Sequence, residues 1–291
     1  MKAIKTEKLT KYYGKSRGII DVDLNIEQGD FYGFIGPNGA GKSTTIRTLL
    51  GLINPTSGNA EIFGKSISGD KTEFLSRIGY LPSETSFYNG LKVSELLDLS
   101  AKLRGVDCRD ERSRLCDRLE LDISRKISEL SFGNRKKVGI VCALQHKPDL
   151  CILDEPTSSL DPLMQREFYS ILSERNKEGT TIFLSSHVLS EVGKYCKKAA
   201  VIKDGRILIE DTVEKLAHTG VKRVTLKGVF SIEESENIRD IKIDDDSVSF
   251  LYNGDSDLLI KYLGSIRPVD FTVTDPDLEE VFIHYYRKED Q

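Results

Sequence analysis

The chain has 291 residues, of which 38% are hydrophobic and 30% charged, and its formal net charge is −4. This composition excludes a disordered chain, and the length suits one large domain with a smaller one, or two of ordinary size. The acidic balance gives no general attraction to nucleic acid, and no apolar run reaches the roughly 18 to 20 residues that span a bilayer.

Secretory and disulfide signals are also missing from the sequence. The first residues have no apolar segment, so we expect no secretory signal. The five cysteines form no CxxC pair, which favours reduced thiols in a cytosolic protein over a zinc site or a disulfide framework.

Apolar runs alternate with helical patterns over roughly the first 215 residues. Because short apolar runs of this kind are typical of buried parallel strands, we predict an α/β fold with a mostly parallel sheet. Residues 92–147 show helical periodicity without a convincing strand, so a helical subdomain at about 86–148 is expected as an insertion. The predicted strands are FYGFIG (31–36), IGYL (78–81), LCILD (150–154), TIFLSS (181–186) and AAVI (199–202).

The pattern changes after Leu216. VKRVTLKG, SIEESENI, RDIKIDD, SVSFLYN, SDLLIKYLGS and IRPVDFTVT predict the order β-α-β-β-α-β, which is that of a small α+β ferredoxin-like domain. A last helix is predicted with Asp275 as its cap and Pro276 at its first position. The expected domains are therefore residues 1–217 and 218–291.

A glycine-rich segment, GPNGAGKST (36–44), follows the first predicted strand of the α/β core and opens a helix. It matches the phosphate-binding pattern G-x-x-x-x-G-K-[ST] in the required strand–loop–helix context. A glycine-rich turn could match by accident in about one chain in a hundred of this length. We predict that Lys42 reaches the β- and γ-phosphates of a nucleotide and that Ser43 ligates Mg²⁺. The remaining predicted contacts are Gly36, Pro37, Asn38, Gly39, Ala40, Gly41 and Thr44.

Polar residues stand at the ends of two further predicted strands. Asp154 and Glu155 follow LCIL, and His187 follows TIFLSS. Parallel strands deliver their carboxyl ends to one edge of a sheet, where Asp154 can hold Mg²⁺ through water and Glu155 can orient or deprotonate an attacking water. His187 could donate a hydrogen bond to the γ-phosphate. The alternatives are that the two carboxylates cap a turn and that the histidine is a surface residue.

The segment LSFGNRKKV (130–138) places Ser131 and Gly133 in a small turn just before three cations, Arg135, Lys136 and Lys137. A helix that starts near Asn134 would hold these cations in its first turn, where the helix dipole disfavours them. Such a helix start suits an anion.

Taken together, GPNGAGKST, LSFGN, LCILDEP, SSLD and His187 resemble, in order and spacing, the ATPase subunit of an ABC transporter over residues 1 to about 215. The resemblance implies that two such domains enclose two ATP molecules, so that Ser131, Gly133 and Asn134 face the γ-phosphate bound by the partner chain. It also implies roles for single residues: Tyr13 rather than Tyr12 stacks on adenine, Glu155 is the catalytic carboxylate, His187 the switch histidine, and Asp161 belongs to the loop that communicates between the two sites.

The sequence departs from this family at two places. LSFGN stands where the commonest form is LSGGQ, and Ser83 stands where the family places a metal-facing glutamine, so that a water or Glu84 is needed to complete the metal site. In the family, the region of Phe87 and Tyr88 lies by the groove that receives helices of the membrane subunit. The alternative is that these two aromatic side chains are buried under the helical insertion.

The part of the chain after residue 217 resembles the extension of exporters of the bacitracin-resistance type, which act on drugs, peptides or lipids. The resemblance implies a cytoplasmic ATP-binding and ATP-hydrolysing subunit that lies on the inner face of the membrane. It is expected to act as a homodimer or heterodimer with a separate permease and without nucleic acid. The alternatives are a soluble ABC ATPase acting on ribosomes or DNA, and a regulatory switch.

Overall fold

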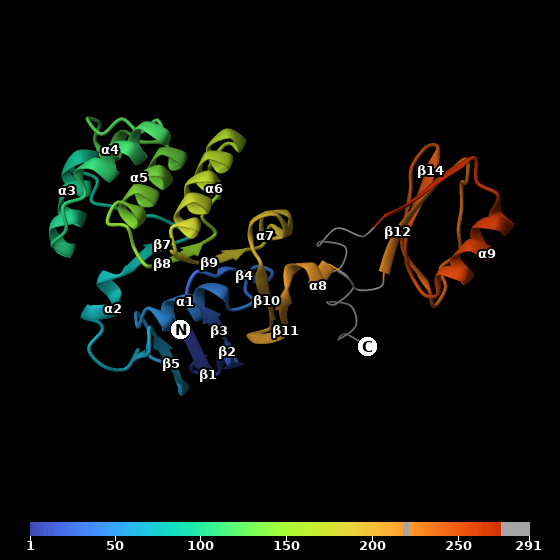
Figure 1. Cartoon of the computed structure of the whole chain (residues 1–291), viewed down its shortest axis with the longest axis horizontal. Helices are drawn as coiled ribbons and strands as arrows, with labels where there is room; N and C mark the ends of the chain where they lie inside the picture. Colours follow the sequence, from blue (N-terminus) through green and yellow to red (C-terminus); the bar gives the residue numbers. More distant parts are fainter. Residues whose placement is uncertain (218–220, 275–291) are drawn as a thin grey trace. The chain divides into compact units, whose positions relative to one another are not determined.

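The computed structural model describes residues 1–217 and 221–274 (Figure 1). Contacts within the chain divide it into two units, Met1–Glu210 and Asp211–Gln291. The sequence predicted the boundary later, after residue 217. None of the helices within the described ranges is both long enough and apolar enough to cross a membrane.

A six-stranded sheet forms the centre of the first unit. The five predicted runs are all strands, and their neighbours pair in parallel, which confirms the predicted α/β core. Every residue of the three central strands is buried, which explains their continuous apolar sequences. In spatial order the strands are β11 (Arg206–Thr212), β10 (Lys198–Lys203), β4 (Phe31–Ile35), β9 (Thr181–Ser186), β8 (Leu150–Asp154) and β7 (Ile78–Leu81).

An antiparallel sheet and helix α1 (Lys42–Leu49) complete one side of this unit. Ile46 and Leu49 of α1 pack in one hydrophobic core with side chains of both sheets, including Leu9, Phe34 and Ile152. The helix that follows the glycine-rich loop is therefore anchored in the core. The second sheet consists of β1 (Lys2–Tyr13), β2 (Ser16–Val22), β3 (Asn25–Glu27), β5 (Ser57–Ile62) and β6 (Lys65–Ser66).

Most other helices gather on the opposite side of the parallel sheet (Figure 1). Residues 92–147 contain helices and no strand, as predicted, and the helix that begins within LSFGN packs against β7. The helices of the insertion are α3 (Val93–Arg104), α4 (Arg109–Arg118), the short 3-10 helix η1 (Ile127–Glu129) and α5 (Phe132–Leu144). The first unit also contains α2 (Thr72–Ser76), α6 (Pro162–Lys177) and α7 (Leu189–Tyr195).

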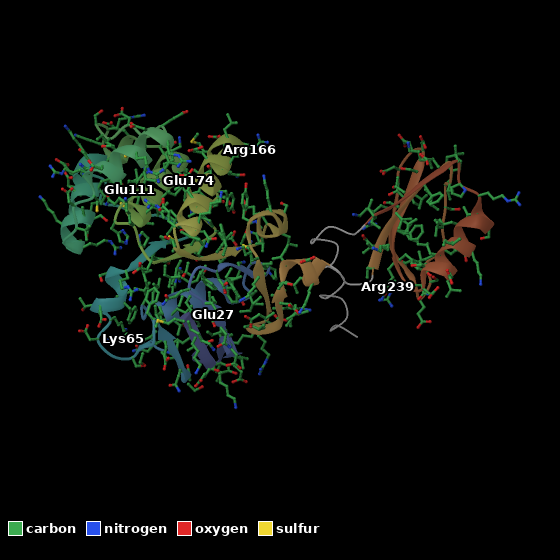
Figure 2. The ribbon with its side chains drawn as sticks, viewed as in Figure 1. Glu27, Lys65, Glu111, Arg166, Glu174 and Arg239 are labelled. Carbon is green, nitrogen blue, oxygen red and sulfur yellow. The ribbon has the colours of Figure 1, made fainter. Side chains whose placement is uncertain are left out.

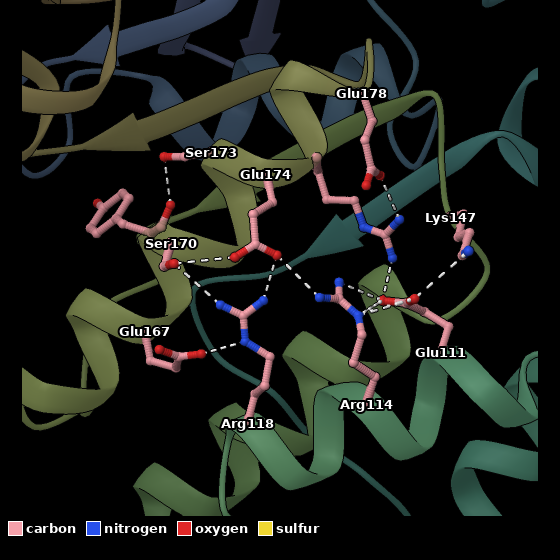
Figure 3. A network of polar contacts seen from close by, with 11 residues as sticks. Glu111, Arg114, Arg118, Lys147, Glu167, Ser170, Ser173, Glu174 and Glu178 are labelled. Carbon is pink, nitrogen blue, oxygen red and sulfur yellow. Dashed lines mark hydrogen bonds and ion pairs between the residues drawn. The ribbon is translucent and has the colours of Figure 1, made fainter.

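An ion-pair network joins α4 of the insertion to α6 of the core (Figures 2 and 3). Glu174 on α6 accepts hydrogen bonds from Arg114 at 3.1 Å and Arg118 at 2.6 Å. Glu111 and Arg175 pair beside them, and only 9% and 4% of their side chains are exposed. Because removal of one partner leaves the other charge poorly solvated, this network holds the helical insertion to α6.

The second unit has its own hydrophobic core. Val224, Leu226 and Phe250 of its sheet pack against Leu259 and Leu263 of α9. Its sheet is antiparallel in the order β13-β14-β12-β15. The elements are α8 (Val213–Ala217), β12 (Val221–Lys227), β13 (Ile238–Ile243), β14 (Ser247–Asn253), α9 (Ser256–Ile266) and β15 (Asp270–Thr274).

One helix predicted in this unit is wrong. SIEESENI is residues 231–238, of which 231–237 contain no helix and only an isolated bridge between Ser235 and Ile238, where β13 begins. A segment this short gains little from helix formation in the absence of a packed apolar face, and it carries three glutamates close together. The four predicted strands and the second helix are present, so the order is β-β-β-α-β. The helix predicted at Asp275 and Pro276 lies outside the described residues.

Candidate active site

The glycine-rich loop runs from the end of β4 to the start of α1. Gly39 and Gly41 have φ angles of +81° and +111°, a region that side-chain-bearing residues rarely adopt. A Cβ atom on Gly41 would lie 2.8 Å from the side chain of Ile19. Both the φ angle and the lack of space therefore require glycine at this position. The loop leads directly into the unpaired N–H groups at the start of α1, which are an anion-binding feature.

Lys42 lies inside this loop. Its side chain is only 6% exposed, and its ammonium group pairs with Glu155 Oε1 at 3.2 Å. The same group donates to the carbonyl oxygens of Gly36 at 2.6 Å and Pro37 at 3.2 Å. The lysine therefore joins the phosphate-binding loop to the carboxyl end of β8.

Glu155 is the centre of the polar cluster at this edge of the sheet. Its second oxygen, Oε2, lies 2.7 Å from Nδ1 of His187, and its backbone N–H donates to Ser185 at 3.1 Å. Glu155 has a φ of +47°, an uncommon conformation for a residue other than glycine and one that collects at functional sites. The structure thus brings together Lys42, Glu155 and His187, which the sequence places far apart.

The oxygen donors nearby fit a magnesium ion. Asp154 is 1% exposed, and its Oδ1 accepts a hydrogen bond from Ser185 at 2.5 Å. Ser43 and Ser83 line one pocket of about 280 Å³ together with Lys42. Carboxylate and hydroxyl oxygens are the ligands that Mg²⁺ prefers, and the buried Glu155 Oε1 has no hydrogen-bond donor within the described residues besides its ion pair. The donor set therefore suits a nucleotide with its metal.

An aromatic residue also lines this pocket. Tyr13 lines it, whereas Tyr12, although 40% exposed, is absent from the described lining. Arg17 and Gly18 also line the pocket, and the sequence reasoning missed both. The sequence did offer a signal for Arg17, because it follows Tyr13 by four residues. A cation so close to the aromatic residue suits a ligand that carries phosphate.

Ser131 caps α5, and this corrects the predicted helix start. The helix begins at Phe132, and the Ser131 hydroxyl accepts a hydrogen bond from the backbone N–H of Asn134 at 3.3 Å. Phe132 is 80% exposed, and a Cβ atom on Gly133 would lie 2.8 Å from the carbonyl oxygen of Ser159. The LSFGN turn is therefore an exposed helix start that tolerates no side chain at Gly133.

Two of the three cations that follow are buried. Lys136 and Lys137 are 3% and 9% exposed. The ammonium group of Lys136 donates to the carbonyl oxygens of Pro82 at 3.1 Å and Ser83 at 2.9 Å. Burial lowers the pKa of Lys136 to about 8, against the opposing attraction of Asp154 and Glu155.

Comparison with known proteins places this arrangement in a family. The family described as "ABC transporter" matches residues 19–158. The bacitracin transport ATP-binding protein BcrA of Bacillus licheniformis is 36% identical over 296 residues, which cover 96% of each chain. The chain belongs to the ATP-binding subunits of ABC transporters.

Solved structures agree with this assignment. An ATP-binding subunit of an ABC transporter superposes with a TM-score of 0.70 and 29% identity, over 74% of this chain and 91% of that one. A dimeric bacterial ABC transporter cassette gives a TM-score of 0.64 and 26% identity, over 72% and 98% of the two chains. The subunit therefore has the P-loop ATPase fold, binds ATP and is an ATPase.

A second pocket of this ABC subunit lies beside the nucleotide pocket and has a volume of about 590 Å³. It brings together the P-loop, the segment after β7, the start of α5 and the Glu155–His187 pair. Its lining comprises Asn38, Ser83, Glu84, Thr85, Ser86, Phe132, Arg135, Lys136, Glu155, Ser158, Ser159 and His187.

Asp161 caps α6 in the ABC subunit, as its sequence context indicated. Its Oδ1 accepts hydrogen bonds from the backbone N–H groups of Leu163 and Met164, both at 3.0 Å. The residue thus fixes the start of the helix that carries the ion-pair network.

An apolar groove of about 810 Å³ lies apart from the nucleotide pocket. Tyr88 is 76% exposed and lines it, so the alternative of a buried Tyr88 is wrong. Phe87 is half-buried and lies near Gly139 of α5. The remaining lining is Leu50, Leu52, Thr72, Leu75, Ser76, Ile78, Tyr80, Leu96, Leu99, Ser100, Leu103, Arg104 and Cys142.

Proposed function

We propose that this ABC subunit works as a dimer whose two ATP sites each combine the P-loop of one chain with the LSFGN turn of the other. The observation that carries the proposal is the position of that turn. Neither Ser131 nor Gly133 belongs to the described lining of either pocket that contains Glu155, and Phe132 between them, although it lines the second pocket, is 80% exposed. The dimeric cassette among its structural relatives supports a dimer.

The nucleotide would be held by residues from both ends of the first pocket. Tyr13 stacks on adenine, the backbone of Gly36–Thr44 surrounds the phosphates, and Lys42 contacts the β- and γ-phosphates. Ser43 and Asp154 would hold Mg²⁺, and Ser83 lines the same pocket as Ser43. When bound, the metal neutralises charge on the phosphate oxygens.

Glu155 is the proposed catalytic carboxylate. Phosphate oxygens entering the loop compete with Glu155 for the ammonium group of Lys42, which lies only 3.2 Å from the carboxylate. The carboxylate then turns to the attacking water, which it orients or deprotonates. His187, 2.7 Å from Glu155, holds that carboxylate and donates to the γ-phosphate. Asp161, at the start of α6, would transmit conformational changes between the two ATP sites of the dimer.

The transport partner is proposed from the apolar groove. Leu103 is 79% exposed and Leu99 is 40% exposed, and both line the groove with Tyr88. Grooves of this kind bind the apolar face of an amphipathic helix. We assign the groove to a separate membrane permease, which would hold the subunit at the inner face of the membrane and export a substrate. Extensive similarity to a bacitracin transport protein favours this function over action on ribosomes or DNA. Residues 218–291 would form an accessory domain.

Leu103→Glu tests the permease assignment. A charge at this exposed position should abolish co-purification with the membrane partner in detergent, while ATP binding stays within about twofold of wild type because the P-loop is untouched. Leu258→Glu, at a 53% exposed leucine of α9 in the other unit, is the matched control and should co-purify normally. Unchanged co-purification of the Leu103 variant would exclude this groove as the permease site.

A further inference from the structure

The segment between β7 and α3 needs an external support. Residues 82–87 have no helix or strand, yet Ser83 lines both pockets around Glu155. A segment without its own backbone ladder is positioned by the side chains that reach its backbone. In this subunit, the side chain that reaches the backbone of the segment is that of Lys136 on α5.

Lys136 supplies the polar support. Its buried ammonium group bridges two successive carbonyl oxygens, those of Pro82 and Ser83, at 3.1 Å and 2.9 Å. Burying a charge without compensation is costly, and here the two carbonyl groups and the nearby carboxylates of Asp154 and Glu155 provide the compensation. An apolar side chain of similar length would fill the same space, so the ammonium group serves the segment rather than the packing.

Gly139 supplies close contact on the same face of α5. Residues three apart on a helix lie on one side, and Gly139 follows Lys136 by one turn. A Cβ atom on Gly139 would lie 2.8 Å from the Thr85 side chain and 2.9 Å from that of Leu81. The helix therefore approaches the segment at two places, through hydrogen bonds from Lys136 to Pro82 and Ser83 and through the close approach of Gly139 to Thr85.

We propose that Lys136 is a positioning residue for ATP hydrolysis: it fixes the 82–86 segment, and with it Ser83, at the nucleotide pocket. The inference rests on the proposed nucleotide site. A serine is short, so its place at the pocket depends on the backbone that carries it, and Lys136 holds that backbone. Because Lys136 is on the helix capped by Ser131, it also links the LSFGN turn of a chain to the nucleotide pocket of that same chain.

The first test reads the segment directly, in the nucleotide-free full chain. Lys136→Met keeps the length of the side chain but removes the donor, so amide hydrogen exchange in residues 83–86 should become about tenfold faster. Gly139→Ala should act on the same amides, since its methyl group must displace Thr85 or Leu81. Lys137→Met is the matched control, because the next residue of a helix points about 100° away, and it should change exchange there by less than about twofold.

The second test reads turnover. Lys136→Met should lower kcat about tenfold and leave the KM for ATP within about threefold, while Lys136→Arg, which keeps charge and donors, should recover part of the loss. Normal exchange in the Lys136→Met segment, exchange raised equally throughout the first unit, or unchanged kcat would each overturn the proposal. The exchange measurement needs neither a dimer nor ATP, so its failure is distinguishable from failure of the shared ATP site.

Discussion

At the residue scale, Glu155 combines two close side-chain contacts with an unusual backbone conformation. It pairs with Lys42, lies against His187 and is held by its own backbone in an unusual conformation at the end of β8. Such a fixed position costs conformational freedom, which is reasonable for a group that must meet a water molecule in one geometry. Lys42 of the P-loop and His187 are thus joined through a single carboxylate, the one proposed to orient the attacking water.

The variant Glu155→Gln should separate ATP hydrolysis from ATP binding. The amide keeps the shape of the side chain but cannot accept a proton, so ATP hydrolysis should fall by about 10²- to 10⁴-fold, while ATP binding stays within about threefold. The variant should accumulate as an ATP-bound dimer in size-exclusion chromatography. Glu73→Gln, at a carboxylate that is 66% exposed, is the control. Wild-type turnover in the Glu155 variant would remove this residue from the catalytic role.

At the scale of elements, α4 and α6 are joined by the network around Glu174 (Figure 3). Hydrogen bonds from Arg118 and Arg114 hold the pKa of Glu174 at about 2, below its ordinary value of 4.5. A carboxylate whose folded pKa is lowered stabilises the fold above its ordinary pKa and loses that contribution as the pH falls through the folded value. The connection between insertion and core should therefore weaken between about pH 4.5 and pH 2.

Glu174→Gln tests that connection. At pH 7 the variant should unfold with a midpoint a few degrees below wild type, since it loses partners for two guanidinium groups. The difference should shrink as the pH falls below about 4.5, because the carboxylate is then protonated in the unfolded wild-type chain, and near pH 2 it is protonated in the folded chain as well. Glu178→Gln, at a 64% exposed carboxylate with one arginine contact, should show a smaller effect. A difference that stays constant down to pH 3 would argue against the network as its source.

Elements also differ in how well the sequence predicts them. The apolar runs at β4, β8 and β9 were readable because strands buried on both faces need continuous apolar residues. SIEESENI was misread as a helix because its pattern carries no information about packing partners. At the site, the P-loop was predictable from local glycine and lysine spacing, whereas the Lys136 contact with Ser83 joins segments 53 residues apart and follows only from the packing of α5 on β7.

At the scale of the whole molecule, two units each carry their own core. All residues of both pockets around Glu155 belong to the first unit. Residues 219–291 should therefore unfold cooperatively as an isolated fragment, and a chain of residues 1–217 should still bind ATP, as checked by circular dichroism melting and a fluorescent ATP analogue. Aggregation of both fragments would mean that the units share a core.

The central claim is that each ATP site is shared between two chains, and mixing two inactive variants tests it most directly. Lys42→Ala removes the charge proposed to contact the phosphates. Gly133→Asp places an anion where the partner's γ-phosphate must approach, and its Cβ atom also meets the Ser159 carbonyl oxygen at 2.8 Å. Each variant alone should be nearly inactive, because both sites of its dimer carry a defect.

A mixed dimer has one site with both defects and one with neither. With equal amounts and free exchange, half of the dimers are mixed and each has one intact site of two, so ATPase activity should recover to about a quarter of wild type. Tagged pull-down checks that the chains exchange. Recovery near that level is the expected result, whereas no recovery despite demonstrated mixed dimers would contradict a site built from Lys42 of one chain and Gly133 of the other.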